Sequence, residues 1–286
     1  MDPPDRVVGV DFSGARDARE NVWIAECERT DGELKLVGCA PASERLAPTG
    51  TDPVATTDAL VSFICGLDGT AVGLDFPFSL PVPVAHGLGA TTWRETLDAV
   101  ATYDDASAMD AACQDATPGD RTYARRACDE VLDSFSPYHF FVKKQTYHGM
   151  VGVLRPLATA GVAWVLPFDT EKARAAGSDS RPRLMETYPA AVLARLGLHD
   201  ERYKGSGQSE CQRREHNLAG LRDHVTAPDS LADRISADAD GDALDALAAA
   251  VGTDVAVRER VMPQTADWRV EGAIYPLTNG AVEMSS

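Results

Sequence analysis

The chain opens with a short apolar run that stops abruptly on an acid, and this feature constrains the fold more than any other. Within Val7–Gly14, three valines and a glycine precede Asp11, and Phe12 and Ser13 follow it. Such a run is typical of a buried strand that ends at a turn. A buried carboxylate without a partner costs several kcal/mol. Asp11 therefore either forms a local turn with Ser13 or holds a metal ion or a ligand.

The same design occurs a second time, in Ala71–Pro77. Gly73 stands two residues before Asp75, and Phe76 stands directly after it. The match is too short to indicate an internal repeat. Two strands of this kind can lie side by side in a sheet, which would bring their carboxylates within reach of one metal ion. The pair predicts a carboxylate cluster at one edge of a sheet.

The segments around these two strands predict an α/β fold. Asn21–Cys27 and Leu34–Ala40 are expected to be strands that form an antiparallel meander with the first strand. Asp52 and Pro53 are expected to begin a crossover helix that ends near Gly69. This order is the opening of a ribonuclease H-like sheet. We expect a single domain, residues 1–286, with a mixed five-stranded ribonuclease H-like sheet flanked by helices.

The rest of the chain is predicted to interrupt and then complete that sheet. Proline-rich and helical patterns indicate a mostly helical insertion at about residues 78–156, after the fourth strand. Strands are expected at Ala163–Phe168 and Arg183–Thr187, and a helix is expected from Tyr188 to Gly197. A further helix is predicted at Asp242–Val251, and Val261–Leu277 is expected to be a surface loop.

Three further acids could join the predicted cluster. Glu186 lies at a strand end just before a helix, where the helix dipole could explain it without a function. Asp242 and Asp245 are three residues apart and share a helix face. This face could be solvated, but Asp245 is the only polar residue between 243 and 251. A carboxylate within a buried apolar helix needs a partner, which favours a metal-binding or catalytic role.

Four ordered motifs resemble a known family. They are VGVDFSGA (8–15), GLDFPFSLP (73–81), ETYPAAVL (186–193) and DALDALAAAV (242–251). The pattern of acids resembles the Holliday-junction resolvase branch of the ribonuclease H-like superfamily. The motifs more closely resemble the domain-of-unknown-function 429 family, which is described as predicted nucleases of that fold.

The resemblance implies a hydrolase that cleaves phosphodiester bonds by a two-metal mechanism. Two Mg²⁺ or Mn²⁺ ions would be bound, with Asp11 shared between them. Asp75 and either Asp242 or Asp245 would be the other ligands. Glu186 would be a further ligand or would orient the attacking water. One ion would activate that water and the other would stabilise the leaving oxygen.

The composition directs attention to a few basic residues. The chain has 44 acidic residues against 27 basic ones and a net charge of −17, with 29 Asp and only 5 Lys. This balance is typical of proteins adapted to a high-salt cytoplasm. In molar salt, local basic patches decide the binding of a polyanion. We expect Lys143, Lys144 and Lys204 to contact phosphates of a nucleic acid or nucleotide, although a solvated loop is an equal alternative.

Aromatic side chains near these lysines could stack on bases, as in single-strand binding proteins. The residues considered for this role are Tyr138, His139, Tyr147 and His148. Arg125 and Arg126 have no comparable support.

Several other classes of protein are disfavoured. The six cysteines form no CxxC or CxxH spacing, so free and mostly buried thiols are expected. The glycines form neither GxGxxG nor a P-loop, and no histidine pairs with a Ser or Cys at a usable spacing. No stretch approaches the length of a membrane span, and the N-terminus lacks the features of a signal peptide, so we expect a cytoplasmic location.

Two alternatives remain open. The first is a non-catalytic protein of the same fold that binds nucleic acid or nucleotide, with its acids far apart or paired with arginines such as Arg183 or Arg213. The second is an actin-like sugar kinase or ATPase, which shares the sheet order. That class needs a duplicated domain and a glycine-rich second phosphate turn, whereas Phe76 and Pro77 follow the second acid here.

Overall fold

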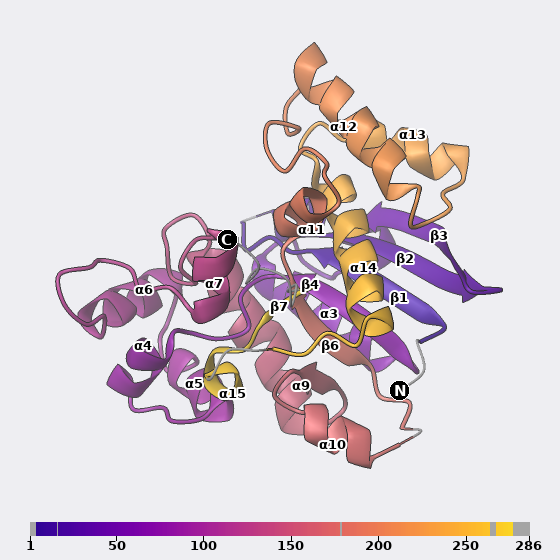
Figure 1. Ribbon diagram of the computed structural model, residues 1–286. Coiled ribbons are helices and arrows are strands. Elements are labelled where there is room, and N and C mark those ends of the chain that lie inside the picture. The colour runs from indigo at the N-terminus through magenta and orange to yellow at the C-terminus, as the bar shows by residue number, and fades with distance from the viewer. Residues whose placement is uncertain (1–3, 16, 178, 264–266, 277–286) are drawn as a thin grey trace, which may run out of the picture.

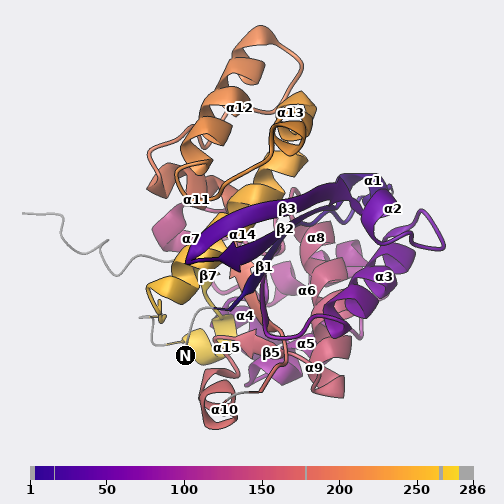
Figure 2. The same cartoon turned by 90° about the vertical axis from the view of Figure 1, so that its right-hand side faces the viewer.

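A mixed seven-stranded sheet lies at the centre of the computed structural model, which describes residues 4–15, 17–177, 179–263 and 267–276. Helices cover both faces of this sheet (Figure 1 and Figure 2). The strands are β1 (Arg6–Asp11), β2 (Trp23–Thr30), β3 (Glu33–Pro41), β4 (Thr70–Asp75), β5 (Trp164–Leu166), β6 (Arg183–Thr187) and β7 (Ile274–Tyr275). Their order is β3-β2-β1-β4-β6-β5, and β7 also pairs with β6. β2 is antiparallel to both β1 and β3, and the remaining pairs are parallel.

The helices fall into groups that follow the chain. Those between β1 and β4 are α1 (Ala18–Asn21), α2 (Ala42–Arg45) and α3 (Pro53–Cys65). Between β4 and β5 lie α4 (Val82–Gly87), α5 (Trp93–Val100), α6 (Ala106–Asp115), α7 (Ala127–Leu132), α8 (Lys143–His148), the π-helical turn η1 (Gly149–Leu154) and α9 (Arg155–Ala160). Later come α10 (Thr170–Ala175), α11 (Pro189–Arg195), α12 (Gln208–Leu221), α13 (Asp229–Ala237), α14 (Asp242–Arg258) and α15 (Trp268–Glu271).

The first half of the chain follows the sequence prediction closely. β1, β2 and β3 form the expected antiparallel meander. The crossover helix α3 begins at Pro53, and the side chain of Asp52 accepts a hydrogen bond from the backbone N–H of Ala55. β4 then returns parallel to β1. An N-cap acid followed by proline is a strong local start signal, which explains why this helix could be located from sequence.

The sheet has seven strands where five were predicted, because the expected segments Ala163–Phe168 and Arg183–Thr187 both join it, as β5 and β6, and β7 is added. β5 pairs with Arg183–Met185 of β6, and β7 pairs with Glu186 and Thr187 of the same strand. Only two residues form β7, which is too short to show a periodic pattern. The tail predicted as a loop therefore contains α15 and β7, and its last residue, Leu277, lies outside the described residues.

The predicted helical insertion is helical in the structure, and its helices continue to Ala160. Other helices differ more from the prediction. α14 continues seven residues beyond Val251, to Arg258, and α13 lies in a segment for which no helix was predicted. In Figure 1, α12 and α13 project above the sheet, while α4 to α7 form a separate lobe beside it.

Alternation along β1 divides the core between the two faces of the sheet. Val8 and Val10 pack with α3 and the insertion, and Val7 packs on the opposite face with α11 to α14. Figure 2 shows α14 on one side of the strands and α3 on the other. Because side chains alternate along a strand, Asp11 shares the face of Val7 and Gly9, under α14.

The cysteines are free, as expected, and Cys27, Cys39, Cys113 and Cys128 are buried. Across the described ranges, no helix is both long enough and apolar enough to cross a membrane.

Candidate functional site

Two glycines bring α14 onto the strands that carry Asp11 and Asp75. A Cβ added to Gly9 would lie 2.1 Å from the carbonyl oxygen of Ala246, and one added to Gly73 would lie 3.0 Å from that of Ala249. The first distance is too short for any other residue without movement of the helix, and a Cβ on Gly73 would also lie 2.1 Å from Oγ1 of Thr253 on the same helix. The glycine two residues before each acid therefore lets α14 pack directly on the sheet beside the acids.

The register of the sheet places the first two acids next to each other. Asp11 of β1 and Asp75 of β4 are Cα partners in parallel strands. Partnered residues on parallel strands point to the same face, so both carboxyl groups point toward the α14 side. The first two acids of the predicted cluster therefore lie side by side at the carboxyl end of these strands.

α14 begins at this same edge and contributes two more acids. Asp245 is buried and Asp242 is half-buried. Neither acid acts as the helix cap, because the carboxylate of Asp238 accepts the backbone N–H of Ala243 at 2.9 Å. The charges of both acids act on Asp11. The structure therefore brings together Asp11, Asp75, Asp242 and Asp245, which we call the aspartate cluster.

One lysine and one tyrosine contact the aspartate cluster directly. The Nζ atom of Lys204 lies 2.7 Å from Oδ2 of Asp245 and 3.3 Å from Oδ1 of Asp242. The hydroxyl of Tyr203 donates a hydrogen bond to Oδ1 of Asp245 at 2.7 Å. Lys204 was predicted as a phosphate contact, and the structure places it as a counter-ion of the acids.

A buried arginine fixes the loop that carries these two residues. Nη1 of Arg214, on α12, donates to the carbonyl oxygens of Tyr203 at 2.6 Å and Gly205 at 2.7 Å. Arg214 is 3 % exposed. The projecting pair of helices α12 and α13 therefore holds Lys204 over the aspartate cluster.

The aspartate cluster carries more negative charge than Lys204 can balance. Burial, together with the charge of Asp245, raises the pKa of Asp75 to about 8. Burial and the charges of Asp242 and Asp245 raise the pKa of Asp11 well above its usual range. Burial raises the pKa of Asp242 to about 6, against the opposing effect of Lys204. Carboxyls that resist ionisation in this way are characteristic of a site that binds a cation or a proton.

Asp11 does not form the local turn that was the alternative explanation for it. The turn after β1 is made by Ser13, whose Oγ accepts the backbone N–H of Ala15 at 3.2 Å. Asp11 is 7 % exposed and its carboxyl faces the other acids.

The phenylalanine after each acid points to the opposite face and joins the two motifs. The rings of Phe12 and Phe76 lie 4.8 Å apart. The insertion packs against the same loops: the side-chain amide of Gln145 donates to the carbonyl oxygen of Asp75 at 2.7 Å, and a Cβ on Gly14 would meet the backbone of Lys144. The insertion helix α8 thus forms a second wall of the site.

A pocket of about 550 Å³ opens between these walls. All four members of the aspartate cluster line it, together with Lys204 and the loop after β1. Pockets of this volume hold ligands of nucleotide size.

Glu186 lines the pocket but belongs to a different cluster. It is the Cα partner of Leu74, one residue before Asp75, and so points to the insertion face of the sheet. Its Oε1 and Oε2 atoms accept hydrogen bonds from Nη2 and Nη1 of Arg126 at 2.6 and 2.7 Å, and Oε2 also accepts the N–H of Phe78. The predicted role of Glu186 as a metal ligand is therefore not supported by its placement.

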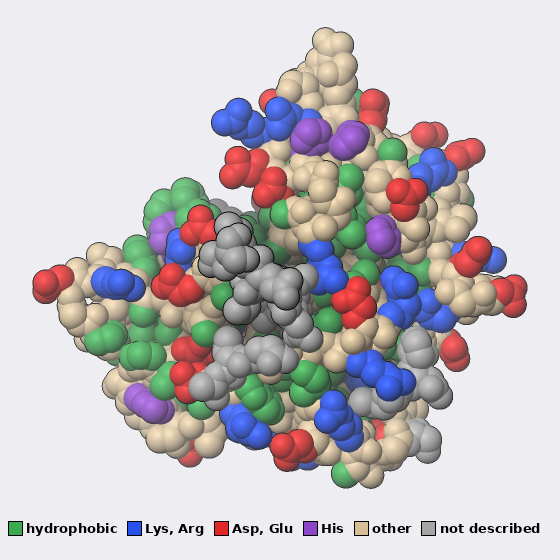
Figure 3. Space-filling view, viewed as in Figure 1, with side chains coloured by type: hydrophobic (Ala, Val, Ile, Leu, Met, Phe, Trp, Pro, Cys, Tyr) green, Lys and Arg blue, Asp and Glu red, His purple; other side chains and the backbone are tan. Residues whose placement is uncertain are grey.

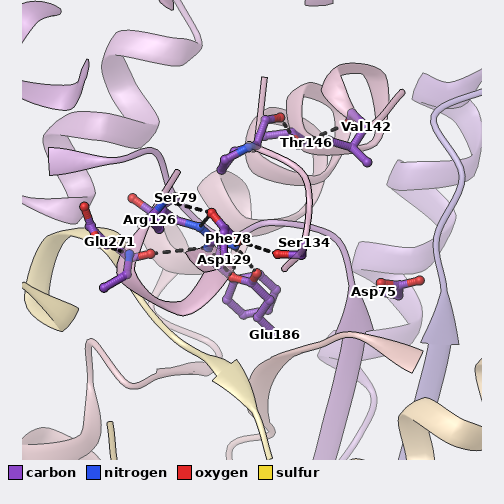
Figure 4. A network of polar contacts seen from close by, with 12 residues as sticks. Asp75, Phe78, Ser79, Arg126, Asp129, Ser134, Val142, Thr146, Glu186 and Glu271 are labelled. Carbon is purple, nitrogen blue, oxygen red and sulfur yellow. Dashed lines mark hydrogen bonds and ion pairs between the residues drawn. The ribbon is translucent and has the colours of Figure 1, made fainter. Parts of the chain in front are cut away.

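Arg126 is the centre of this second cluster, which we call the Arg126 cluster. The arginine is fully buried and also binds Asp129 through Nε and Nη2. The carboxylate of Glu271 accepts the N–H groups of Val82 and Ala127 at the edge of the same network. Figure 4 shows Arg126, Asp129 and Glu186 close together, with Asp75 apart from them and outside the network.

The two other lysines named from sequence have different positions. Lys143 pairs with Asp110 at 2.7 Å inside the insertion and does not line the pocket. Lys144 is exposed, lines the pocket and forms no ion pair with the described residues.

Most of the aromatic residues proposed for base stacking are instead packed or hydrogen-bonded within the insertion. Tyr138 is fully buried, and its hydroxyl accepts the N–H of Ala124. The hydroxyl of Tyr147 donates to the carbonyl oxygen of Tyr103, and His148 is half-buried. Only His139 has its ring among exposed aromatic neighbours.

The donor set of the aspartate cluster fits a hard divalent cation. It consists of carboxylate oxygens, which Mg²⁺ and Mn²⁺ prefer, and it has an excess of negative charge. As the side chains stand, however, no group of three or more His, Cys, Asp or Glu within the described residues is arranged to hold a metal ion. Lys204 already engages two of the acids. A metal ion would have to share their oxygens with this ammonium or displace it.

Some residues of the site carried no signal in the sequence. Tyr203 and Arg126 were not singled out, because neither stands in a motif with an acid that it contacts. Arg126 is separated from Glu186 by 60 residues. The hydroxyl of Thr187, also in the pocket lining, is buried and finds no partner among the described groups.

Comparison with known proteins finds a similarity to one family over part of the chain and gives no activity. No curated protein and no solved structure matches the chain. A family profile described as "Protein of unknown function (DUF429)" matches residues 162–267. This range includes the motifs at 186–193 and 242–251, whereas those at 8–15 and 73–81 lie outside it. Over residues 162–267, the chain is therefore similar to the DUF429 family.

Proposed function

We propose that this protein is a metal-dependent phosphodiesterase that acts on a nucleic acid or nucleotide. The observation that carries the proposal is the meeting of Asp11, Asp75, Asp242 and Asp245 from two parallel strands and the start of a helix. Four buried or half-buried carboxyls, with which Lys204 is the one cation to pair in the described part of the chain, have no evident structural purpose, because like charges destabilise each other.

The sheet supports a ribonuclease H-like fold. A three-stranded antiparallel meander, the crossover helix α3 and the parallel return of β4 beside β1 give the expected order. β6 lies beside β4, and α14 packs across β1. On this interpretation β5 and β7 are additions at the edge of β6.

The aspartate cluster would hold Mg²⁺ or Mn²⁺ through Asp11 and Asp75, with Asp245 or Asp242. A bound metal would neutralise the charge of the phosphate and activate a water molecule. Tyr203 and Lys204 orient Asp245 through contacts to its two oxygens. Lys144, at the rim, provides a cation for phosphate outside the cluster.

Glu186 has a positioning role in this proposal. Its two bonds to Arg126 join β6 to the insertion, and the insertion in turn packs on the loop after β1. The Arg126 cluster therefore fixes the second wall of the pocket relative to the sheet.

One observation favours the non-catalytic alternative. Lys204 neutralises part of the cluster and occupies oxygens that a metal would need. Another observation speaks against this alternative. It predicts that the acids pair with Arg183 or Arg213, and the described residues show no such ion pair. A protein that binds phosphate through lysines alone would not need divalent metal.

Cleavage assays distinguish the two functions. Labelled single-stranded, duplex, hybrid and branched nucleic acids would be incubated at high KCl with Mg²⁺ or Mn²⁺. We expect metal-dependent cleavage that falls at least about 100-fold in Asp11→Asn, because a ligand of the metal that would neutralise the phosphate charge is lost. Asp229→Asn is the matched control, since that acid is 94 % exposed on α13.

The assay also has an outcome that contradicts the proposal. If the folded wild-type protein cleaves none of these substrates with either metal, or if Asp11→Asn cleaves as fast as the wild type, the phosphodiesterase assignment is wrong. Circular dichroism at the assay salt concentration would establish that each protein is folded.

A further inference from the structure

The rim of the pocket carries three exposed phenylalanine rings and a half-buried histidine that the cleavage chemistry does not use. They lie in the segment between α7 and α8, and we call them the aromatic rim: Phe135, His139, Phe140 and Phe141. The three phenylalanines are 47 %, 56 % and 65 % exposed. Figure 3 shows hydrophobic side chains gathered over the lobe beside α7. Phenylalanine is usually buried, so a group of exposed rings on a highly charged protein indicates a binding surface.

The rings contact one another in a continuous group, in which one pair is stacked and the others are tilted. The ring of His139 lies parallel to that of Phe135, with centroids 4.5 Å apart and an interplanar angle of 11°. The rings of Phe140 and Phe141 lie 3.9 Å apart, and Phe141 is 5.3 Å from Phe135. Flat aromatic faces of this kind suit another planar ring better than they suit an aliphatic chain.

The backbone under the aromatic rim is anchored, so the rings are presented in a fixed arrangement. The fully buried Tyr138 bonds through its hydroxyl to Ala124 and Thr117. Ser134 donates to Asp129 of the Arg126 cluster, and Thr146 of α8 donates to the carbonyl oxygen of Pro137. A preordered surface loses less entropy when it binds a ligand.

The aromatic rim belongs to the same pocket as the acids. Phe135 and Phe141 line the pocket together with Asp11, Asp75 and Lys144. A ligand that reaches both regions needs a phosphate for Lys144 and a planar group for the rings. Nucleotides in a single strand have both, and their bases are free to stack on protein aromatics. In a duplex the base faces are already stacked and are not available.

We propose that the aromatic rim is a stacking site for an unpaired nucleobase, which makes single-stranded nucleic acid the preferred ligand. This inference rests on the proposed function for the identity of the ligand class. It adds that the bases, and not only the phosphates, are recognised at this pocket.

Anisotropy of a fluorescein-labelled ten-residue oligothymidylate tests the proposal. Ca²⁺ would replace Mg²⁺ to limit cleavage, and an abasic oligomer with the same phosphates would be the comparison probe. We expect the wild type to bind oligothymidylate about tenfold more tightly than the abasic oligomer, as stacking of a base allows. The double variant Phe140→Ala/Phe141→Ala should lose this preference, and Phe140→Tyr/Phe141→Tyr should keep it.

A matched control removes exposed apolar surface elsewhere. Val54→Ala, at a side chain that is 60 % exposed on α3, should keep the full preference for oligothymidylate. The proposal is overturned if the wild type binds both probes equally or if the double alanine variant retains the preference. A wild-type dimer in ultracentrifugation that the alanine variant abolishes would identify a second copy of the chain as the occupant, and would also overturn it.

The same proteins separate this inference from the phosphodiesterase proposal. A base preference in a wild type that cleaves nothing with Mg²⁺ or Mn²⁺ would support the aromatic rim and contradict the enzyme. Metal-dependent cleavage without any base preference would support the enzyme and contradict the stacking role of the aromatic rim.

Discussion

The aspartate cluster and the Arg126 cluster line one pocket, yet their charges are balanced in different ways. In the Arg126 cluster, both oxygens of Glu186 and of Asp129 accept hydrogen bonds from one buried guanidinium, and backbone N–H groups bind Glu186 and Glu271. In the aspartate cluster, which has four carboxyls, Lys204 is the one cation among the described residues that pairs with the acids. A buried acid with a full set of partners serves the fold, whereas acids left in excess are available to a ligand.

The largest effect on stability is expected in the Arg126 cluster, where the buried acids have hydrogen-bond partners. Arg126→Met would leave Glu186 and Asp129 buried without their counter-ion, which should lower the free energy of unfolding by about 3–5 kcal/mol. Urea denaturation would measure the change. The triple variant Arg126→Met/Asp129→Leu/Glu186→Leu, which removes the charges together, should recover part of the loss. If Arg126→Met is as stable as the wild type, the cluster does not have the structural role assigned to it.

An intermediate effect is expected at the glycine that lets α14 reach the aspartate cluster. Gly9→Ala would place a Cβ against the backbone of Ala246, and overpacking of this kind costs about 1–3 kcal/mol. Gly38→Ala on β3 is the matched control, because its Cβ would meet nothing closer than 3.6 Å. Equal unfolding midpoints for the two variants would show that α14 does not need this close approach.

The sequence predicted the acids of β1, β4 and α14 because each stands in a short local pattern. Apolar runs locate the ends of β1 and β4, and the single polar residue in an apolar helix identifies Asp245. Glu186 stands in an equally clear pattern, but its face of the sheet depends on register with β4, where it is paired with Leu74. A shift of one residue moves a side chain to the opposite face, and local sequence does not specify that register.

Other features depend on contacts between distant segments. The Arg126–Glu186 pair joins the insertion to β6, and Lys204 reaches α14 from a loop held by Arg214. The exposure of the aromatic rim could not be read from its sequence, because a run of aromatic residues is more often buried.

The smallest predicted effect is a gain in stability, unlike the two losses above, and it follows substitution of Asp75. Its folded-state pKa of about 8 lies above the ordinary value of 3.8, so the folded protein holds this proton more tightly than the unfolded chain does. Stability from this group is therefore lost as the pH rises from about 4 to about 8. Asp75→Asn should remove that loss.

Thermal unfolding without divalent metal would show this effect. At pH 8 we expect the Asp75→Asn midpoint to lie roughly 2–4 °C above the wild type, about 1 kcal/mol for a chain of this size, and the gap to narrow toward pH 5. A variant less stable than the wild type at pH 8 would mean that the acids of the cluster do not repel each other.

Calorimetric titration of the metal-free protein with Mn²⁺, at high KCl and pH 8, tests most directly whether the aspartate cluster is a cation site. Our account predicts saturable binding by the wild type and by Asp229→Asn, with no detectable binding by Asp11→Asn. Absence of binding by the folded wild type, or equal affinity in Asp11→Asn, would contradict it.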